Sequence, residues 1–350
     1  MEYPRKQEQE EASTEVTEAA PGVLRMQLPI QMPGLGHVNS YALIDERGAA
    51  LVDAGLPGPN TWTALKDRLK QADLSISDIH TVIVTHSHPD HFGTAGRVAK
   101  ESGADFVTHS AFRTWWMPHS HGDAGDDADV EIHDVDPDHL ATSNPFRGET
   151  PWGGTPFKPP LKRRLQWRLM KAGMGGAFVA PTPTVRVKHG DVLKLAGREW
   201  FAVHTPGHTL DHLCLHDPES GTLLSGDHVL PTITPHISGL GAGPDPLAGF
   251  FSSLDRVAAL DGVKTVLPAH GLPFTDLVGR VDAIKAHHEK RLVKIREISA
   301  ALGPATVTDF SHELFRKERW GSMAESETYA HLEHLRLLDE ADRDDSSGEA

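Results

Sequence analysis

The stretch TVIVTHSHPDH, residues 81–91, places four side chains that commonly bind metal ions within six positions. The run before them is apolar and β-branched, which predicts a buried strand that ends at the first histidine. His86 and His88 alternate just beyond this strand, so both can face one point. Asp90 and His91 follow a proline that bends the chain, so they can face a second point nearby. The chain contains 23 histidines, and this stretch favours a metal site over a mere abundance of histidine.

Three later stretches have the same form, an apolar strand pattern that ends in a potential ligand. His208 lies in HTPGHT, Asp227 in LLSGDH and His270 in VLPAHG. Ligands at the ends of neighbouring strands meet at one edge of a sheet, and Gly207 allows the backbone to approach closely there. Together with the first stretch, these residues supply the nitrogen and oxygen ligands that zinc prefers.

The elements that must position these side chains alternate between strand and helix patterns. Two short apolar runs at 40–45 and 49–53, separated by ERG, predict a β-hairpin. The stretch 60–72 has apolar residues at helical spacing and predicts a helix with Asn60 as its cap. Further strands are expected at 79–86, 104–109, 184–187, 191–195, 198–205, 212–217, 222–227 and 264–270, and further helices at 92–103, 247–260, 277–299, 308–315 and 329–338.

The order of the motifs HxHxDH, TPGHT, GDH and PAHG resembles that of the metallo-β-lactamase-fold hydrolases. The resemblance covers roughly residues 22–275 apart from an insert, and it implies an α/β fold, a four-layer αββα sandwich with the metal site on one edge. It also implies two metal ions per chain that share one carboxylate, with Zn²⁺ as the first choice and iron or manganese as alternatives. The implied ligands are His86, His88 and His208 for the first ion, Asp90, His91 and His270 for the second, and Asp227 for both.

The chemistry implied by this resemblance is hydrolysis. A metal pair lowers the pKa of a bridging water, so that hydroxide forms near neutral pH and can attack an ester, a thioester or a lactone. Asp90 would be the catalytic residue that passes the proton onward. Two Zn²⁺ ions bring four positive charges, and Asp90, Asp227 and the hydroxide remove three of them. The locally positive site therefore favours a small anionic substrate.

Asp53 lies in LVDAG, which matches the early aspartate motif of these hydrolases. The resemblance implies that its carboxylate orients a metal-binding histidine and so fixes the tautomer of the ring. The alternative is an aspartate that only forms a turn before Gly55. His204, His212 and His228 flank the ligand loops, and each can either reach the site or pack beside it.

Two other functions share this fold and stay open. The first is a metal-dependent endoribonuclease that acts on single-stranded RNA. The second is a persulfide dioxygenase with one iron ion, which intact Asp90, His91 and His270 disfavour. The bridging Asp227 argues against a true zinc β-lactamase, which lacks that residue. Leu230 lies in the region where acyl-homoserine lactonases carry a tyrosine, so that activity is also disfavoured.

Residues 113–180 break the alternation of strands and helices and are expected to form a lid over the site. Within them, the segment 158–173 carries six basic residues and no acidic residue, interleaved with apolar side chains. It predicts a cationic cover over an anionic substrate or a surface that contacts lipid or RNA, with a solvated helix face as the alternative to both. The candidate substrate contacts are Arg163, Arg164, Trp167 and Arg168.

The expected domain order is a disordered acidic tail at 1–20, a catalytic domain at 21–275, a helical domain at 276–340 and a second disordered tail at 341–350. The helical domain resembles, more weakly, the winged-helix appendage of one branch of these hydrolases. Its acidic end argues against binding to DNA, so we expect it to pack on the core or to form a homodimer.

Composition limits the partners and the compartment. The net charge of −15 argues against binding to the phosphate backbone of nucleic acid, so we expect a small-molecule substrate. No stretch approaches the roughly 20 apolar residues of a membrane span, and the polar N-terminal segment lacks the apolar core of a secretory signal. Cys214 is the only cysteine, so no internal disulfide can form. These features predict a cytoplasmic protein.

Overall fold

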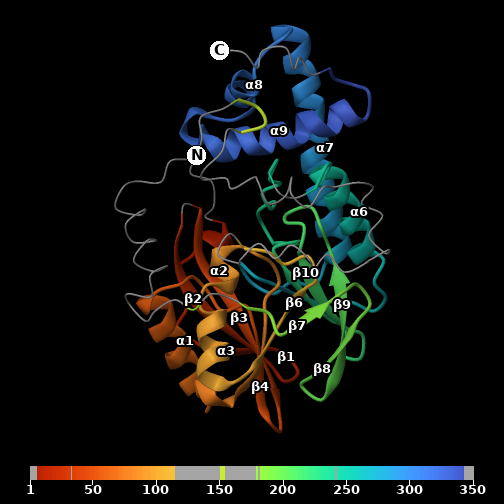
Figure 1. Cartoon of the computed structure of the whole chain (residues 1–350). Helices are drawn as coiled ribbons and strands as arrows, with labels where there is room; N and C mark the ends of the chain where they lie inside the picture. The colour runs from red at the N-terminus through yellow and green to blue at the C-terminus, as the bar shows by residue number, and fades with distance from the viewer. Residues whose placement is uncertain are drawn as a thin grey trace.

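The computed structural model describes residues 6–32, 34–114, 150–153, 179, 182–240 and 243–342 of the chain. Two β-sheets pack face to face, and helices cover the outer face of each sheet (Figure 1). Three separate hydrophobic cores lie between these four layers. The predicted four-layer α/β sandwich is therefore confirmed.

The first sheet is formed by Thr17–Ala20 (β1), Val23–Met32 (β2), Leu35–Asp45 (β3), Gly48–Val52 (β4), Ile79–Ile83 (β5), Asp105–His109 (β6) and Val185–Val187 (β7). These strands lie in sequence order from β1 to β7. Pairing is antiparallel from β1 to β4 and parallel from β4 to β7. The predicted hairpin is the pair β3 and β4, which pairs Asp45 with Gly48.

The second sheet is formed by Val192–Leu195 (β8), Arg198–His204 (β9), Leu213–Asp217 (β10), Thr222–Gly226 (β11) and Thr265–Pro268 (β12). Its strand order is β12-β11-β10-β9-β8. Only the pair β11 and β12 is parallel among these strands, whereas the other neighbours are antiparallel.

The helices are Pro59–Gln71 (α1), Pro89–Phe92 (α2), Ala95–Ser102 (α3), Pro246–Ala258 (α6), Leu277–Leu302 (α7), Val307–Leu314 (α8) and Ser322–Leu337 (α9). Short 3₁₀ turns form at Gln7–Gln9 (η1), Ile76–Asp78 (η2) and Lys317–Arg319 (η3). Helices α1 and α3 cover the first sheet, and α6 and α7 cover the second (Figure 1). Helices α8 and α9 lie beyond one edge of the sandwich and pack against α7 (Figure 1).

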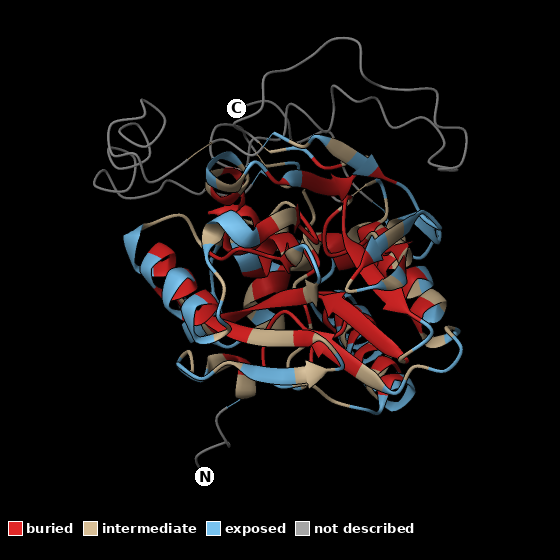
Figure 2. Ribbon diagram, turned by 90° about the horizontal axis from the view of Figure 1, so that it is seen from below, coloured by how far each residue is buried: buried red, intermediate tan, exposed pale blue. Residues whose placement is uncertain are grey.

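Alternation along the strands assigns each side chain to one of the cores. In β4, Leu51 faces the core beneath α1 and α3, whereas Val52 faces the second sheet. In β11, Leu223 packs toward α6 and α7, and Leu224 faces the first sheet. These strands are buried on both faces, which explains their continuous apolar runs in the sequence. Buried residues gather in the two sheets and on the helix faces that turn toward them (Figure 2).

The ends of the helices agree with the sequence prediction in part. Helix α3 ends at Gly103, whose φ of +76° is the left-handed conformation that glycine adopts readily. Helix α1 begins earlier than predicted, because Gly58 is the residue before its first turn and Pro59 occupies its first position. Proline is favoured there because its fixed φ suits the helix and its missing N–H needs no partner. Asn60 is therefore inside the helix and is not its cap.

The N-terminal segment differs from the sequence prediction. The composition of residues 1–20 predicts a disordered tail, but residues 6–20 contain η1 and β1. Strand β1 pairs with β2, and its backbone hydrogen bonds compensate for its polar side chains. The polar segment is thus ordered by pairing with the neighbouring strand and by the contact of Glu8 with the distant Thr232, neither of which its own composition can reveal.

The C-terminal part contains three helices, and the insert lies largely outside the described residues. Within residues 276–342, which the structure describes, α7, α8 and α9 occur without any β-strand, so the wing of a winged helix is not seen there.

The candidate substrate contacts Arg163, Arg164, Trp167 and Arg168 lie outside the described residues. Across the described part of the chain, no helix combines the length and apolar character needed to cross a membrane.

Candidate metal centre

The candidate ligands follow strands that end at one edge of the sandwich. His86 lies just beyond β5, Asp227 directly follows β11, and His270 comes two residues after β12. His208 lies in the loop that follows β9. Strands β11 and β12 are parallel, so their carboxyl ends lie together. The structure brings all seven predicted ligands into two adjacent groups at this edge.

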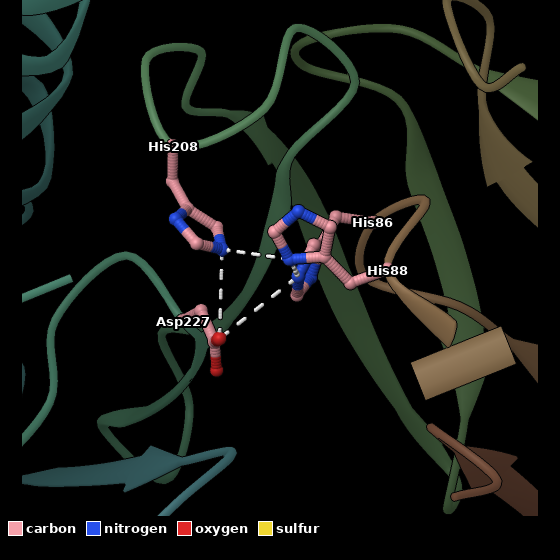
Figure 3. Close-up of side chains that lie close together, drawn as sticks. All are labelled: His86, His88, His208 and Asp227. Atoms are coloured by element: carbon pink, nitrogen blue, oxygen red, sulfur yellow. Dashed lines mark hydrogen bonds and ion pairs between the residues drawn. The ribbon is translucent and has the colours of Figure 1, made fainter. Parts of the chain in front are cut away.

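The first group consists of His86, His88, His208 and Asp227 (Figure 3). The Nδ1 atom of His88 lies 3.0 Å from Nε2 of His86 and 3.1 Å from Nε2 of His208. The Oδ2 atom of Asp227 lies 3.5 Å from Nε2 of His208 and 3.9 Å from Nε2 of His86. All four side chains therefore turn a potential ligand atom toward the same small space.

Hydrogen bonds on the far side of the rings show which nitrogens carry a lone pair. His208 Nδ1 donates to the carbonyl oxygen of His236 at 2.7 Å, which leaves its Nε2 without hydrogen. Thr85 Oγ1 donates to Asp53 and lies 3.1 Å from Nδ1 of His86, from which it can accept. Nε2 of His86 and Nε2 of His208 therefore both present a lone pair to Nδ1 of His88, and a hydrogen on that atom can satisfy only one of them. A cation at this point would instead be bound by both.

The second group consists of Asp90, His91 and His270. The Oδ2 atom of Asp90 lies 3.6 Å from Nε2 of each histidine. Asp227 lies between the two groups, because its Oδ1 is 3.2 Å from Nε2 of His270 and its Oδ2 is 3.7 Å from Nε2 of His91. A single carboxylate thus contacts both groups of side chains.

The histidines of the first group are held neutral. Burial lowers the pKa of His86 and His88 well below its usual value, and neighbouring imidazoles add to the effect. Burial also lowers the pKa of His208. An imidazole must be unprotonated to bind a metal ion, so these three rings are prepared for that role.

The second group attracts positive charge. Burial acts to lower the pKa of His91, but Asp53, Asp90 and Asp227 outweigh it and raise that pKa well above its usual value. The pKa of His270 is also raised, because Asp227 and Asp90 outweigh burial. Buried carboxylates that surround these rings therefore favour a cation at this position, whether a proton or a metal ion.

Asp53 lies next to the second group and is only 2% exposed. Its Oδ2 accepts from Nδ1 of His91 at 2.8 Å, and its Oδ1 accepts from the backbone N–H of Thr85 at 2.9 Å. It therefore contacts both the loop before His86 and the ring of His91. This bond leaves Nε2 of His91 free to face Asp90 and Asp227.

Strand β3 holds the loop that carries His270, which the sequence did not indicate. His270 Nδ1 donates to the carbonyl oxygen of His37 at 2.7 Å, which leaves Nε2 free. Asn39 Nδ2 and the hydroxyl of Tyr41 both donate to the carbonyl oxygen of Pro268 at 2.8 Å. His37 fixes the His270 tautomer through its backbone, so no side-chain pattern could have identified this role.

The three histidines that flank the ligand loops have different places. His212 Nε2 accepts from the backbone N–H of Asp227 at 3.0 Å, so His212 positions a ligand. Its Nδ1 must then carry the hydrogen and donate to Thr205 Oγ1 at 2.7 Å. His204 stacks on another buried imidazole, with ring centroids 3.8 Å apart, and His228 packs against an aromatic ring. One of the three therefore reaches a candidate ligand directly.

Comparison with known proteins agrees with this geometry. A family model described as the metallo-beta-lactamase superfamily matches residues 33–270. A probable metallo-hydrolase of Bacillus subtilis strain 168, YqjP, is 27% identical over 314 residues, which are 86% of this chain and 88% of that protein.

Two solved structures are also similar over most of their length. A metallo-beta-lactamase family protein from Thermus thermophilus is 28% identical with a TM-score of 0.67, and the match covers 91% of this chain and 94% of that one. A beta-lactamase domain protein from Burkholderia ambifaria is 25% identical with a TM-score of 0.68, over 95% of this chain and 91% of that one. Because the family model covers more than half of the chain, this protein belongs to the metallo-beta-lactamase superfamily.

Proposed function

We propose that this chain is a binuclear metal-dependent hydrolase that cleaves an ester, a thioester or a lactone of a small anionic substrate. The observation that carries the proposal is the convergence of two groups of buried ligands around one shared carboxylate, Asp227. The relative YqjP is described as a probable metallo-hydrolase, which supports hydrolysis as the class of reaction.

The side chains present fit two metal ions. Nε2 of His91, Nε2 of His270 and Oδ1 of Asp227 are buried and make no hydrogen bond of good geometry within the described part of the chain, although the last two lie 3.2 Å apart. Buried atoms of this kind are expected where a cation binds. In the first group, nitrogen separations of 3.0 and 3.1 Å are close to the roughly 3.3 Å edge of a tetrahedron with Zn–N bonds of about 2.05 Å. Nitrogen and carboxylate ligands suit Zn²⁺, with iron or manganese as alternatives.

We propose that His86, His88 and His208 hold one ion, that Asp90, His91 and His270 hold the other, and that Asp227 contacts both. Ions bound there would supply Lewis acidity and a water molecule of lowered pKa. Asp90 is buried beside both histidines of the second group, and we assign it the role of accepting the proton released in hydrolysis. Asp53 keeps His91 in the tautomer that can bind.

Charge supports an anionic substrate. Two divalent ions bring four positive charges, whereas Asp90 and Asp227 together remove two. The rest of the chain is acidic, with a net charge of −15, so the site would be a local positive region on a negative molecule. Such a region favours a substrate with a carboxylate or phosphate group, or a reaction whose transition state carries negative charge.

The test begins with metal analysis of the purified protein, followed by a panel of acyl thioesters, lactones, phosphodiesters and single-stranded RNA. We expect two metal ions per chain and turnover of an ester, thioester or lactone. His88→Ala should reduce that turnover by at least about a hundredfold, because loss of even an indirect partner of a metal ligand costs 10–100-fold. His312→Ala, which removes a histidine of α8 outside both ligand groups, serves as the control.

Other outcomes would contradict the proposal in distinct ways. Cleavage of RNA alone would assign the endoribonuclease function instead. A single iron ion with oxidation of a persulfide would assign the dioxygenase function. Unchanged turnover by the H88A variant would show that the reaction occurs elsewhere on the molecule.

A further inference from the structure

The N-terminal segment Lys6–Glu10, here named the strap, crosses the loop that follows Asp227. Its residue Glu8 is fully buried. Oε1 of Glu8 accepts from the backbone N–H of Thr232 at 2.7 Å and of Ile233 at 3.0 Å, and Oε2 contacts the hydroxyl of Thr232. A carboxylate from the start of the chain therefore orders a loop more than 220 residues away in sequence.

The strap also contacts the loop that carries His270. Gln7 Oε1 accepts from the backbone N–H of Leu272 at 3.1 Å. The carbonyl oxygen of Glu10 accepts from Nδ1 of His37 at 2.8 Å, and Nε2 of His37 accepts from the N–H of Gly271 at 3.0 Å. Because one ring nitrogen of His37 must donate and the other must accept, this link requires a neutral ring of one tautomer.

Close packing fixes the path of the strap. A Cβ at Gly36 would collide with the backbone of Glu10, so the strap lies directly on β3. Arg280 of α7 donates to the carbonyl oxygens of Leu230 and Ile233, at 2.5 and 2.6 Å, and holds the same loop from the other side. The strap and α7 thus enclose the loop that leaves Asp227.

The two loops that the strap contacts carry Asp227 and His270. His270 belongs to the second ligand group alone, and Asp227 contacts both groups. In the described structure the strap contacts none of the three histidines of the first group. His208, for example, is oriented by the carbonyl oxygen of His236. Loss of the strap should therefore act on one of the two proposed ions more than on the other.

We infer that the strap positions the second metal site, and that Glu8 is a positioning residue for Asp227 and His270. This inference rests on the proposed binuclear site. Removal of the Glu8 carboxylate leaves the partly buried backbone N–H groups of Thr232 and Ile233 without their acceptor and frees the loop to shift toward water. The shift would move Asp227 and His270 away from their common point without changing any ligand.

The experiment is a titration of metal-free, full-length protein with Co²⁺, followed by visible absorption and by the number of ions bound. Wild type should bind two Co²⁺ ions. The Glu8→Ala variant should bind the second ion about tenfold more weakly. Its loss of affinity for the first ion should be smaller, because that ion keeps its three histidines and depends on the loop through Asp227 alone. Glu8→Gln should restore most of this affinity, because its amide oxygen can still accept from both N–H groups. His88→Ala, which keeps all of the second group, identifies the absorption of the second ion.

Controls separate positioning from loss of the fold. Glu11 is an exposed glutamate next to the strap. The Glu11→Ala variant should therefore bind both ions as wild type does. Thermal melting will show whether the Glu8→Ala variant folds. If it does not fold, the Gln7→Ala variant replaces it, because this substitution removes the smaller contact with Leu272. That variant should bind the second ion severalfold more weakly. Two normal binding steps in a folded Glu8→Ala protein would overturn the inference about the strap. Fewer than two ions in wild type would instead overturn the binuclear proposal.

Discussion

At the level of single residues, Asp53 determines which nitrogen of His91 is free. Its carboxylate accepts from His91 and from Thr85, and it is almost completely buried. Its backbone has a φ of +56°, a left-handed conformation that aspartate and asparagine tolerate better than most residues. A change at this position can therefore alter the charge while it leaves the backbone unchanged.

Asp53→Asn tests this role. The amide can present either oxygen or nitrogen to His91, so the ring is no longer held in one tautomer. We expect about 10–100-fold weaker binding of the second ion and a similar loss of hydrolytic activity. The effect on the first ion should be smaller, because Asp53 reaches His86 only through Thr85. Titration of the metal-free variant with Co²⁺ measures both steps. Equal binding of both ions by wild type and variant would show that Asp53 only forms the turn before Gly55.

At the level of elements, helices α7 and α9 contact the loop that orients His208. Glu327 of α9 contacts Arg291 of α7, and its Oε2 lies 3.4 Å from Nδ1 of His236. Burial acts to raise the pKa of Glu327, but His236 and Arg291 outweigh it and lower that pKa. Since the carbonyl oxygen of His236 accepts from His208, the C-terminal helices are linked to the first ligand group.

Glu327→Gln should therefore weaken the first ion rather than the second. The substitution keeps the size of the side chain but removes its charge, so Arg291 loses its ionic partner and His236 loses the carboxylate beside its ring. We expect about tenfold weaker binding of the first ion in the Co²⁺ titration. Glu333→Gln is the matched control on the same helix, because Glu333 contacts Arg336 one turn away. Equal weakening of both ions would show a general loss of packing instead.

At the level of the whole molecule, burial of neutral histidines makes stability depend on pH. Burial is the main cause that lowers the pKa of His109 and His228 to about 3, of His204 and His331 to about 4, and of His288 to about 2. In the unfolded chain each of these rings has a pKa near its usual value of about 6.5. The unfolded state therefore binds more protons than the folded state below that pH.

The free energy of unfolding should consequently fall as pH decreases below about 6.5, by up to about 1.4 kcal/mol per pH unit for each such histidine. The stability that these histidines contribute is fully present above pH 6.5, because there the rings are neutral in both the folded and the unfolded protein. Urea unfolding at pH 7.5, 6 and 5 measures this dependence for metal-free protein.

The His288→Phe variant should show a smaller dependence of the free energy of unfolding on pH between pH 6 and 5. The slope should fall by up to the equivalent of one bound proton, about 1.4 kcal/mol per pH unit. The reason is that the substitution removes one ring of the buried pair that His288 forms with His331 between α7 and α9. His312→Phe, a change at a half-buried position on α8, provides the comparison. A slope that stays the same in the H288F protein would show that His288 is not part of this acid sensitivity.

The sequence by itself determined the composition of the candidate site and the order of the elements around it. Each candidate ligand follows an apolar strand pattern, and the strands buried on both faces produced continuous apolar runs that could be recognised locally. The alternation of strand and helix patterns is a local property, whereas the four-layer sandwich was implied by the resemblance of the motif order to the metallo-β-lactamase-fold hydrolases. The substrate contacts Arg163, Arg164, Trp167 and Arg168 stay a prediction.

Only the tertiary structure decided what holds these ligands in place. Glu8 lies in an acidic segment that composition assigns to a disordered tail, yet its carboxylate is buried against Thr232. His37 and His236 orient His270 and His208 through backbone carbonyl oxygens, which every residue type possesses. A sequence records side-chain types at each position, whereas these bonds depend on distances between segments far apart in the chain. They exist only after the sheets have packed and brought those segments together.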